Sequence, residues 1–362
     1  MNLSRKVFAL TGTVALLSGV MAPAVMAQEP LIESVCLVTD LGRVNDGTFN
    51  QYAHDGSVRA TDEFGLEYTY IETQAQTDYE ANIQTCLDEE FDAIITVGFL
   101  IADATRAAAA ANPDTYFIGV DQFFADPLAN LVGIQFREDQ GGFLVGALAA
   151  LMTESGTVAG VYGIDIPPVI KFRNGFEQGV AYINELNGTD VQTLGVYIDD
   201  FIAPDRGATA AEQFIGEGAD VIFGAGGPTG SGGITYAAQQ GVYVIGVDQD
   251  EWVTTFGAGE TPGAEFVISS AVKRVDNGVF DMIAALAEGV GFPEGGTYIL
   301  EVANDGIGFA EGHDAEIPED VIELMNEILE GLYDGTIETG IDPVSGALLS
   351  ELEATAEATP AS

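Results

Sequence analysis

Two aspartates follow apolar runs in two similar stretches of the chain, where a carboxylate could accept hydrogen bonds from a bound ligand. Gly119-Val120-Asp121-Gln122 ends one run, and Gly246-Val247-Asp248-Gln249 ends another 127 residues later. A turn and a helix-forming stretch precede each run, which predicts a strand, loop, helix and strand in both copies. Ligands bind at the carboxyl ends of the strands in an open parallel sheet. The sequence therefore predicts two related halves, each with a carboxylate at its ligand-binding edge.

The repeat extends upstream of these aspartates. Residues 35–53 and 158–180 each predict a strand, a polar loop and a helix, with Phe172 in the loop before the second helix. Residues 224–233 are rich in glycine but lack the Lys-Ser/Thr pair of a P-loop, which predicts a tight turn beside a small ligand. Two facing halves would form a cleft lined by Asp40, Asp46, Asn50 and Asp121 from the first half and by Phe172, Gly226 and Asp248 from the second.

Catalytic chemistry has less support than binding. His54 and His313 are isolated, so no metal site is expected, and the sequence has no GxSxG motif and no cofactor motif. The carboxylates could still serve as general acid and base of a secreted nucleoside or glycoside hydrolase. Because Asp121 and Asp248 occupy equivalent positions, we favour a binding protein, not an enzyme, in which both accept hydrogen bonds from sugar hydroxyls.

The first 27 residues predict a cleavable signal peptide. Arg5 and Lys6 precede an apolar core, Val7 to Val20, and Val25-Met26-Ala27 supplies small residues for cleavage. The core is shorter than the ~20 residues of a membrane-spanning helix. No cysteine follows it directly, so no lipid anchor is expected at this point. We expect a periplasmic or secreted protein.

The composition is strongly acidic. Fifty-seven Asp and Glu against 11 Lys and Arg give a formal net charge of −46 at pH 7. Such a charge repels nucleic acid and phosphorylated ligands, so neither is expected as a partner. It also destabilises the compact state unless salt screens it, which indicates a halophilic source.

The cysteines and lysines are few enough to be informative. Cys36 lies early in the first predicted strand and Cys86 lies late in the helix before the strand at Ala93. Because exported proteins meet an oxidising compartment, we expect a Cys36–Cys86 disulfide. Lys171 and Lys273 are the only lysines after the predicted signal. Lys171 could have a functional role or form an ordinary salt bridge.

Four stretches in this order resemble a known family: VTDLGRVNDGTFNQ, GIDIPPVIKFRNGFEQGV, ADVIFGAGGPTGSGG with GVYVIGVDQD, and SSAVKRVDNGVFDMI. They are similar to the BMP (basic membrane protein) family of ABC-transporter substrate-binding proteins, whose best-understood members are purine nucleoside receptors. The resemblance covers about residues 34 to 312.

The resemblance implies the type I periplasmic-binding fold, an α/β fold of two doubly wound parallel-sheet lobes joined by three crossover segments. The crossovers are expected near Gln135 to Arg137, Ile268 to Ser270 and Val302 to Asn304. The implied division is residues 31–136 with 269–302 for lobe 1, 137–268 with 303–344 for lobe 2, and 345–362 as a disordered acidic tail.

The resemblance also implies a site for the base of a purine nucleoside. Asp46 and Asn50 would bond the edge of the base, and Asp40 would support their loop or contact the ligand. Phe49 and Phe172 would stack on its two faces. The sequence departs from the family pattern here, because Asn45 replaces a usual acidic residue and Gly47 a usual lysine.

The sugar would bind at the predicted strand ends. By the same resemblance, Asp121 and Asp248 would accept from ribose hydroxyls, and the backbone of Gly226 and Gly227 would approach the ligand. Lys273 would donate to the ligand or hold Asp248.

The resemblance implies capture of guanosine, inosine or adenosine and delivery to a membrane ABC permease, with no cofactor and a monomeric state. A ligand-binding module of a sensor system is the other reading of such a protein.

The charge predicts a salt-dependent stability. The melting temperature should rise as NaCl is raised from about 0.1 M to about 1 M, because the Debye length falls from about 10 Å to about 3 Å. Thermal denaturation at several NaCl concentrations measures this directly. A melting temperature that does not rise would remove the halophilic interpretation.

Overall fold

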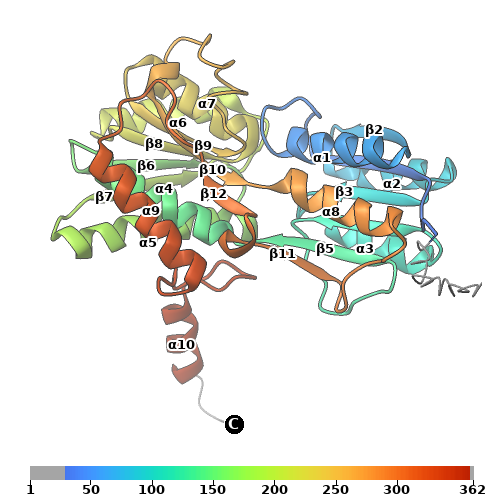
Figure 1. Ribbon diagram of the computed structural model, residues 1–362. Helices are drawn as coiled ribbons and strands as arrows, with labels where there is room; N and C mark the ends of the chain where they lie inside the picture. Colours follow the sequence, from blue (N-terminus) through green and yellow to red (C-terminus); the bar gives the residue numbers. More distant parts are fainter. Residues whose placement is uncertain (1–28, 359–362) are drawn as a thin grey trace, which may run out of the picture.

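The computed structural model describes residues 29–358, which form two α/β lobes, each built on a six-stranded sheet (Figure 1). The predicted signal peptide, residues 1–27, lies outside the described residues. The first sheet has the order β11 (Thr297–Leu300), β5 (Leu131–Phe136), β4 (Tyr116–Val120), β3 (Ala93–Val97), β1 (Ser34–Leu41), β2 (Glu67–Thr73). The second has the order β12 (Ile307–Phe309), β10 (Val267–Lys273), β9 (Tyr243–Asp248), β8 (Val221–Ala225), β6 (Thr157–Tyr162), β7 (Gln192–Tyr197).

The two sheets repeat one topology. Strands β1 to β5 have the same spatial order as β6 to β10, and a late strand, β11 or β12, completes each sheet. All neighbouring strands of the first sheet are parallel, and in the second sheet β12 pairs antiparallel with β10. The central strands are buried, as expected for parallel sheets covered by helices on both faces. The predicted duplication into two doubly wound lobes is confirmed.

Helices cover the faces of both sheets (Figure 1). The first lobe carries α1 (Phe49–Phe64), η1 (Gln76–Asp78), α2 (Tyr79–Asp88), α3 (Ala102–Ala111) and α8 (Val275–Ala287). The second carries α4 (Glu138–Met152), α5 (Pro167–Asn187), α6 (Pro204–Gly216), α7 (Gly227–Gln239), η2 (Ala264–Phe266) and α9 (Glu319–Asp334).

Glycines let α4 and α5 approach closely. A Cβ atom at Gly142 would lie 2.2 Å from the carbonyl oxygen of Phe172, and one at Gly175 would lie 2.3 Å from that of Asp139. Any larger residue at either position would push the helices apart, because backbone atoms cannot give way at these distances. This contact fixes the first turns of α5 against the start of α4.

The chain passes between the lobes three times. It leaves β5 at Phe136 to begin α4, leaves β10 at Lys273 to begin α8, and runs from β11 through η3 (Val302–Asn304) to β12. The second crossover therefore lies later than the predicted Ile268 to Ser270, and residues 269–273 belong to lobe 2. The reason is that β10 keeps its pairing with β9 as far as Val272 and with β12 as far as Lys273.

The prediction of a disordered tail from Ser345 is wrong for the described part. Gly346 accepts a hydrogen bond from the Asn174 side chain, at 2.7 Å, and Ile341 pairs with Leu348 in a β-bridge. A helix, α10 (Leu349–Ala358), follows and points away from the lobes (Figure 1). Its sequence is rich in Leu, Glu and Ala, which are good helix formers. The segment can therefore form a helix although its composition is acidic. The last four residues lie outside the described range.

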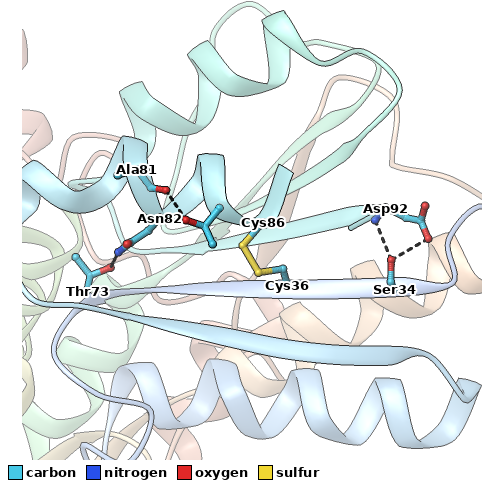
Figure 2. The surroundings of a disulfide bond; sticks show 8 residues. Ser34, Cys36, Thr73, Ala81, Asn82, Cys86 and Asp92 are labelled. Carbon is cyan, nitrogen blue, oxygen red and sulfur yellow. Dashed lines mark hydrogen bonds between the residues drawn. A yellow bond between two sulfur atoms is a disulfide. The ribbon is translucent and has the colours of Figure 1, made fainter. Parts of the chain in front are cut away.

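Cys36 and Cys86 form a disulfide that joins β1 to α2 (Figure 2). Their Cα atoms are 6.0 Å apart, and both side chains are buried in the core of the first lobe. On the same strand the Ser34 hydroxyl donates to the Asp92 carboxylate at 3.0 Å, as Figure 2 also shows. The bridge closes a loop of 50 residues.

Removing the disulfide should lower the free energy of unfolding by about 4 kcal/mol, because an open loop of this length gives the unfolded chain more conformational entropy. Urea denaturation of the Cys36→Ala/Cys86→Ala variant would measure the change. Wild-type protein under reducing conditions should show a similar loss. An equal stability in all three samples would contradict the expectation.

Candidate ligand-binding site

A pocket lies between the lobes, where the carboxyl ends of both sheets meet. It encloses about 580 Å³, including space open to solvent. All ten residues that the sequence assigned to ligand binding line it: Asp40, Asp46, Phe49, Asn50, Asp121, Phe172, Gly226, Gly227, Asp248 and Lys273. The structure thus brings them together, and their individual contacts with a ligand stay a prediction.

The two strand-end aspartates share an uncommon backbone conformation. Asp121 follows β4 and has φ 60°, and Asp248 ends β9 and has φ 65°. Left-handed conformations are rare for residues other than glycine, and they collect at functional sites. Both side chains are buried, so the same local geometry in each half turns one carboxylate toward the cleft.

Asp121 is held by Lys273. The Lys273 Nζ atom donates to Asp121 Oδ2 at 2.6 Å, while the buried Oδ1 atom has no hydrogen-bond partner among the described residues. Burial raises the pKa of Asp121 to about 6, against the lowering effect of Lys273. Burial alone would lower the pKa of Lys273, but its acidic neighbours, Asp121 first, raise it. Asp121 therefore keeps one oxygen ready for a donor on a ligand.

Asp248 has no such partner. Its carboxylate makes no hydrogen bond with the described residues, and burial raises its pKa to about 8 against the lowering effect of Lys273. The nearby charge of Asp121 adds to the rise. An acceptor that is buried and unbonded is costly unless a ligand satisfies it.

Asp46 and Asn50 are already bonded within the protein. Asp46 accepts from the backbone amides of Thr48, Asn50 and Gln51, at 2.9 to 3.1 Å, and so satisfies amides at the start of α1. Asn50 donates to Asp46 at 3.0 Å and accepts from the backbone amide of Asp40 at 2.9 Å. Both side chains line the pocket, and both hold the loop that precedes α1.

Asp40 anchors the other side of this loop. Its Oδ1 atom accepts from the Leu41 amide at 2.7 Å and from the Tyr79 hydroxyl at 2.5 Å. Burial raises the pKa of Asp40 to about 6, although the Tyr79 hydrogen bond lowers it. Its position fits support of the loop, and its side chain lines the pocket.

Aromatic rings form much of the pocket wall. Phe49, at the start of α1, and Phe172 come from different lobes, and the Lys273 ammonium lies 4.9 Å and 5.9 Å from their ring centroids. Phe172 is not in a loop as predicted. Helix α5 begins at Pro167, because proline suits the first turn of a helix, and this places Phe172 inside α5.

Two further aromatic residues, Phe99 and Phe201, line the pocket and were missed by the sequence analysis. Phe99 follows Gly98 at the end of β3, which is the place that Gly227 occupies after β8 in the repeat. The duplication could therefore have indicated it. Phe201 lies in the loop between β7 and α6, where no repeated motif marks it.

Gly226 and Gly227 shape the loop that enters α7. Gly226 has φ 155°, and a Cβ atom there would lie 2.3 Å from the backbone nitrogen of Gly163. Gly227 has φ 54°. The requirement for glycine at position 226 thus comes from contact between two loops of lobe 2, and both glycines still present their backbone to the pocket.

Besides the Lys273–Asp121 hydrogen bond, two hydrogen bonds join the lobes beside the pocket, and we call these two the closure contacts. The Gln249 side-chain amide donates to the Thr48 carbonyl at 2.9 Å, and the Thr254 hydroxyl donates to the Gly47 carbonyl at 2.7 Å. In each, lobe 2 supplies a side chain and lobe 1 a backbone oxygen. The lobes are therefore closed over the pocket.

Across residues 29–358, no helix combines the length and apolarity needed to cross a bilayer. That same range holds no group of three or more His, Cys, Asp or Glu side chains that could bind a metal ion.

Two doubly wound lobes with a ligand pocket at their facing strand ends define a solute-binding protein of the type I periplasmic-binding fold. Residues 33–335 match the Bmp family model, described as ABC transporter substrate-binding protein PnrA-like. The chain belongs to this family of ABC transporter substrate-binding proteins, as the sequence resemblance indicated.

The chain is also similar to individual proteins along most of its length. The chain is 33% identical to a CD4+ T-cell-stimulating antigen of Listeria monocytogenes, over 86% of this chain and 88% of that protein. It is 28% identical to the ABC transporter nucleoside-binding protein BmpA of Lactococcus lactis, over 82% and 86% of the two chains. A solute-binding protein of an ABC transporter system from Aeropyrum pernix superposes with a TM-score of 0.74 at 27% identity, over 84% and 92%.

The raised pKa of Asp248 predicts how stability depends on pH. Between its ordinary value of 3.8 and about 8, the folded protein holds a proton at Asp248 that the unfolded chain has released. The ligand-free protein should therefore lose stability as pH rises through this window, by up to about 1.4 kcal/mol per pH unit from this group.

Asp248→Asn removes this proton linkage. Urea denaturation between pH 5 and 8 should give a shallower fall in the free energy of unfolding for Asp248→Asn than for the wild type. Equal slopes for both proteins would show that Asp248 is already ionised at the lower pH.

Proposed function

We propose that this protein captures a purine nucleoside outside the cytoplasm and delivers it to the membrane permease of an ABC importer. The observation that carries the proposal is the closed pocket between the lobes, which combines buried strand-end carboxylates with aromatic walls. Membership in a family of ABC transporter substrate-binding proteins supports the importer role. A relative named a nucleoside-binding protein supports the class of ligand.

The sugar is the part of the ligand that the carboxylates would recognise. Asp121 Oδ1 is buried without a partner among the described residues, and the Asp248 side chain lines the same pocket with 5% of its surface exposed. Ribose hydroxyls can donate to both side chains, because an ionised carboxylate offers several acceptor sites and a protonated carboxyl keeps acceptor capacity beside its one O–H donor. Lys273 keeps Asp121 in place and has a donor left for the ligand.

The base would lie against the aromatic walls. Phe49 and Phe172 enter the pocket from opposite lobes, which suits the two faces of a flat ring, and stacking contributes about 1 to 3 kcal/mol per base. Asp46 and Asn50 would act on the base edge mainly through the loop that they hold in shape, because their polar atoms already have partners.

Charge favours a nucleoside over a nucleotide. Asp40, Asp46, Asp121 and Asp248 all line the pocket, with Lys273 as the cation among its lining residues. A phosphate group would meet several acidic side chains and one ammonium, and like charges in a buried site disfavour each other strongly. The ligand that fits this field is neutral.

Capture would need no chemistry. The open lobes would admit the ligand, which shifts the population toward the closed form by its better fit to that form. The closure contacts stabilise the closed form, and a closed monomer would then dock on the permease. We expect the protein to act in the periplasm or after secretion.

Calorimetric titration in high salt tests the proposal. Ligand-free protein, prepared by unfolding and refolding, is titrated with guanosine, inosine, adenosine, cytidine and ribose, and the solutions are then analysed for products. We expect saturable binding of a purine nucleoside that is recovered unchanged. Release of free base would indicate a hydrolase, and absence of heat with every compound would overturn the nucleoside assignment.

Phe172→Leu should weaken nucleoside binding by about 1 to 3 kcal/mol, or about 5- to 150-fold in Kd, through loss of stacking. Phe176→Leu is the matched control. Phe176 lies one turn further along α5 and is fully buried. It does not line the pocket, and its ring stacks on that of Phe223 with the two centroids 5.4 Å apart. The control should lose stability and keep its affinity. Equal affinities in the two variants would rule out a stacking role for Phe172.

A further inference from the structure

The two lysines of the described chain meet at one buried carboxylate. Lys171 and Lys273 are 2% and 1% exposed, and Glu138, which lies between them, is 0% exposed. A lysine is almost never buried without an anionic partner. In a chain with so few lysines, the placement of both around Glu138 indicates a specific role for this carboxylate.

The contacts form a chain that ends at the ligand pocket. Lys273 Nζ lies 2.9 Å from Glu138 Oε1 and 2.6 Å from Asp121 Oδ2. Lys171 forms an ion pair with Glu138 Oε2 and donates to the Phe136 carbonyl at 2.7 Å. Lys273 and Asp121 line the pocket, whereas Glu138 and Lys171 do not. Glu138 can therefore act on the ligand only through the pocket residues Lys273 and Asp121.

These residues lie where the chain passes between the lobes. Glu138 is the first residue of α4, directly after the first crossover, and Lys273 is the last residue of β10, before the second. Lys171 belongs to α5, which the close glycine contacts hold against the start of α4. The positions of Glu138 and Lys273 are thus set by the crossovers that connect the two lobes.

The charges of the group cancel. Two buried ammonium groups, of Lys171 and Lys273, face two buried carboxylates, of Glu138 and Asp121. Removal of a single partner would leave an uncompensated buried charge. The Lys273 ammonium forms an ion pair with Glu138 and donates a hydrogen bond to Asp121. Its ammonium also lies 4.8 Å from the centroid of the Phe136 ring, which leaves little freedom to turn.

We propose that Glu138 is a positioning residue of the ligand site, which fixes the Lys273 ammonium so that Asp121 keeps one oxygen free for the ligand. Lys171 forms the second ion pair of the Glu138 carboxylate. The inference rests on the proposed function for its ligand, and the placement of Lys273 by Glu138 can be tested without any ligand.

The pKa of Asp121 provides a readout that a purely structural role of Glu138 would not change. Glu138 raises the pKa of Asp121, so its removal should lower that pKa below the wild-type value of about 6. Affinity should fall as the pH is lowered, because Asp121 gains a proton and loses an acceptor site. The charged groups that face Asp121 are Lys273 from β10, Glu138 from α4, Lys171 from α5, Asp40 from β1 and Asp248 from β9.

Glu138→Gln tests the proposal, with inosine and guanosine as probes. We expect Kd to rise about tenfold or more, because the ion pair that holds the Lys273 ammonium is lost. We also expect the acid midpoint of binding to move to lower pH. The matched control is Asp139→Asn, which neutralises the adjacent buried carboxylate, whose partners are Arg137 and Thr339. The control should keep the wild-type midpoint.

A ligand-free measurement separates this proposal from the nucleoside assignment. The full chain has three lysines, so NMR of lysine-labelled protein gives few signals, and Lys171→Met and Lys273→Met assign them. In the absence of ligand, Glu138→Gln should shift the Lys273 signal and Asp139→Asn should leave it in place. If no nucleoside binds the wild type, the nucleoside assignment fails while this shift still tests the placement of Lys273.

A second variant covers the case in which Glu138→Gln does not fold. Glu138→Gln/Lys171→Met removes one charge of each sign and leaves Lys273 paired with Asp121. It should fold, shift the Lys273 signal and show the same loss of affinity and the same movement of the midpoint. A wild-type Lys273 signal in the folded variants, or an unmoved midpoint with wild-type affinity, would overturn the proposal.

Discussion

Burial of negative charge is the constraint on which the structure depends. The chain carries a formal net charge of −46, and its fold still gathers carboxylates at the place where two parallel sheets face each other. Burial raises the pKa of Asp40, Asp121 and Asp248 there. Two buried lysines offset part of this charge, and the remaining acceptors face the pocket. A neutral ligand with several hydrogen-bond donors can therefore stabilise the site by bonding to these acceptors.

The same charges connect the pocket to the connections between the lobes. Glu138 and Lys273 each lie at an end of a crossover, and the close packing of α4 on α5 brings Lys171 to them. The residues at the connections between the lobes therefore also fix the geometry of the ligand site. The glycines that let two helices touch also fix where a lysine can place its ammonium.

Much of the site could be predicted because the chain is duplicated. The repeated Val-Asp-Gln after an apolar run placed Asp121 and Asp248 at strand ends, and the sheets confirm that topology. A repeat carries this information because equivalent strands end at equivalent edges. The resemblance to a family added Phe49, Gly227 and Lys273, and all three line the pocket.

Other features depend on contacts that the sequence does not display. Phe172 lies inside a helix because two prolines begin α5 early, and the tail forms α10 although its composition is acidic. Phe201 comes from a loop without a motif. The role of Glu138 was missed because an acidic residue at the start of a helix is common, and only packing shows that this one is buried between lysines.

The closure contacts have a consequence for the lifetime of the complex. Their acceptors are the backbone carbonyls of Gly47 and Thr48, which every residue type possesses, whereas their donors are the side chains of Thr254 and Gln249. Substitution in lobe 1 leaves both acceptors in place, so the two donors in lobe 2 set the strength of the bonds. Both must break before the ligand can leave, while neither is needed for it to enter the open form. Residence time can therefore change through these two side chains while the rate of encounter stays constant.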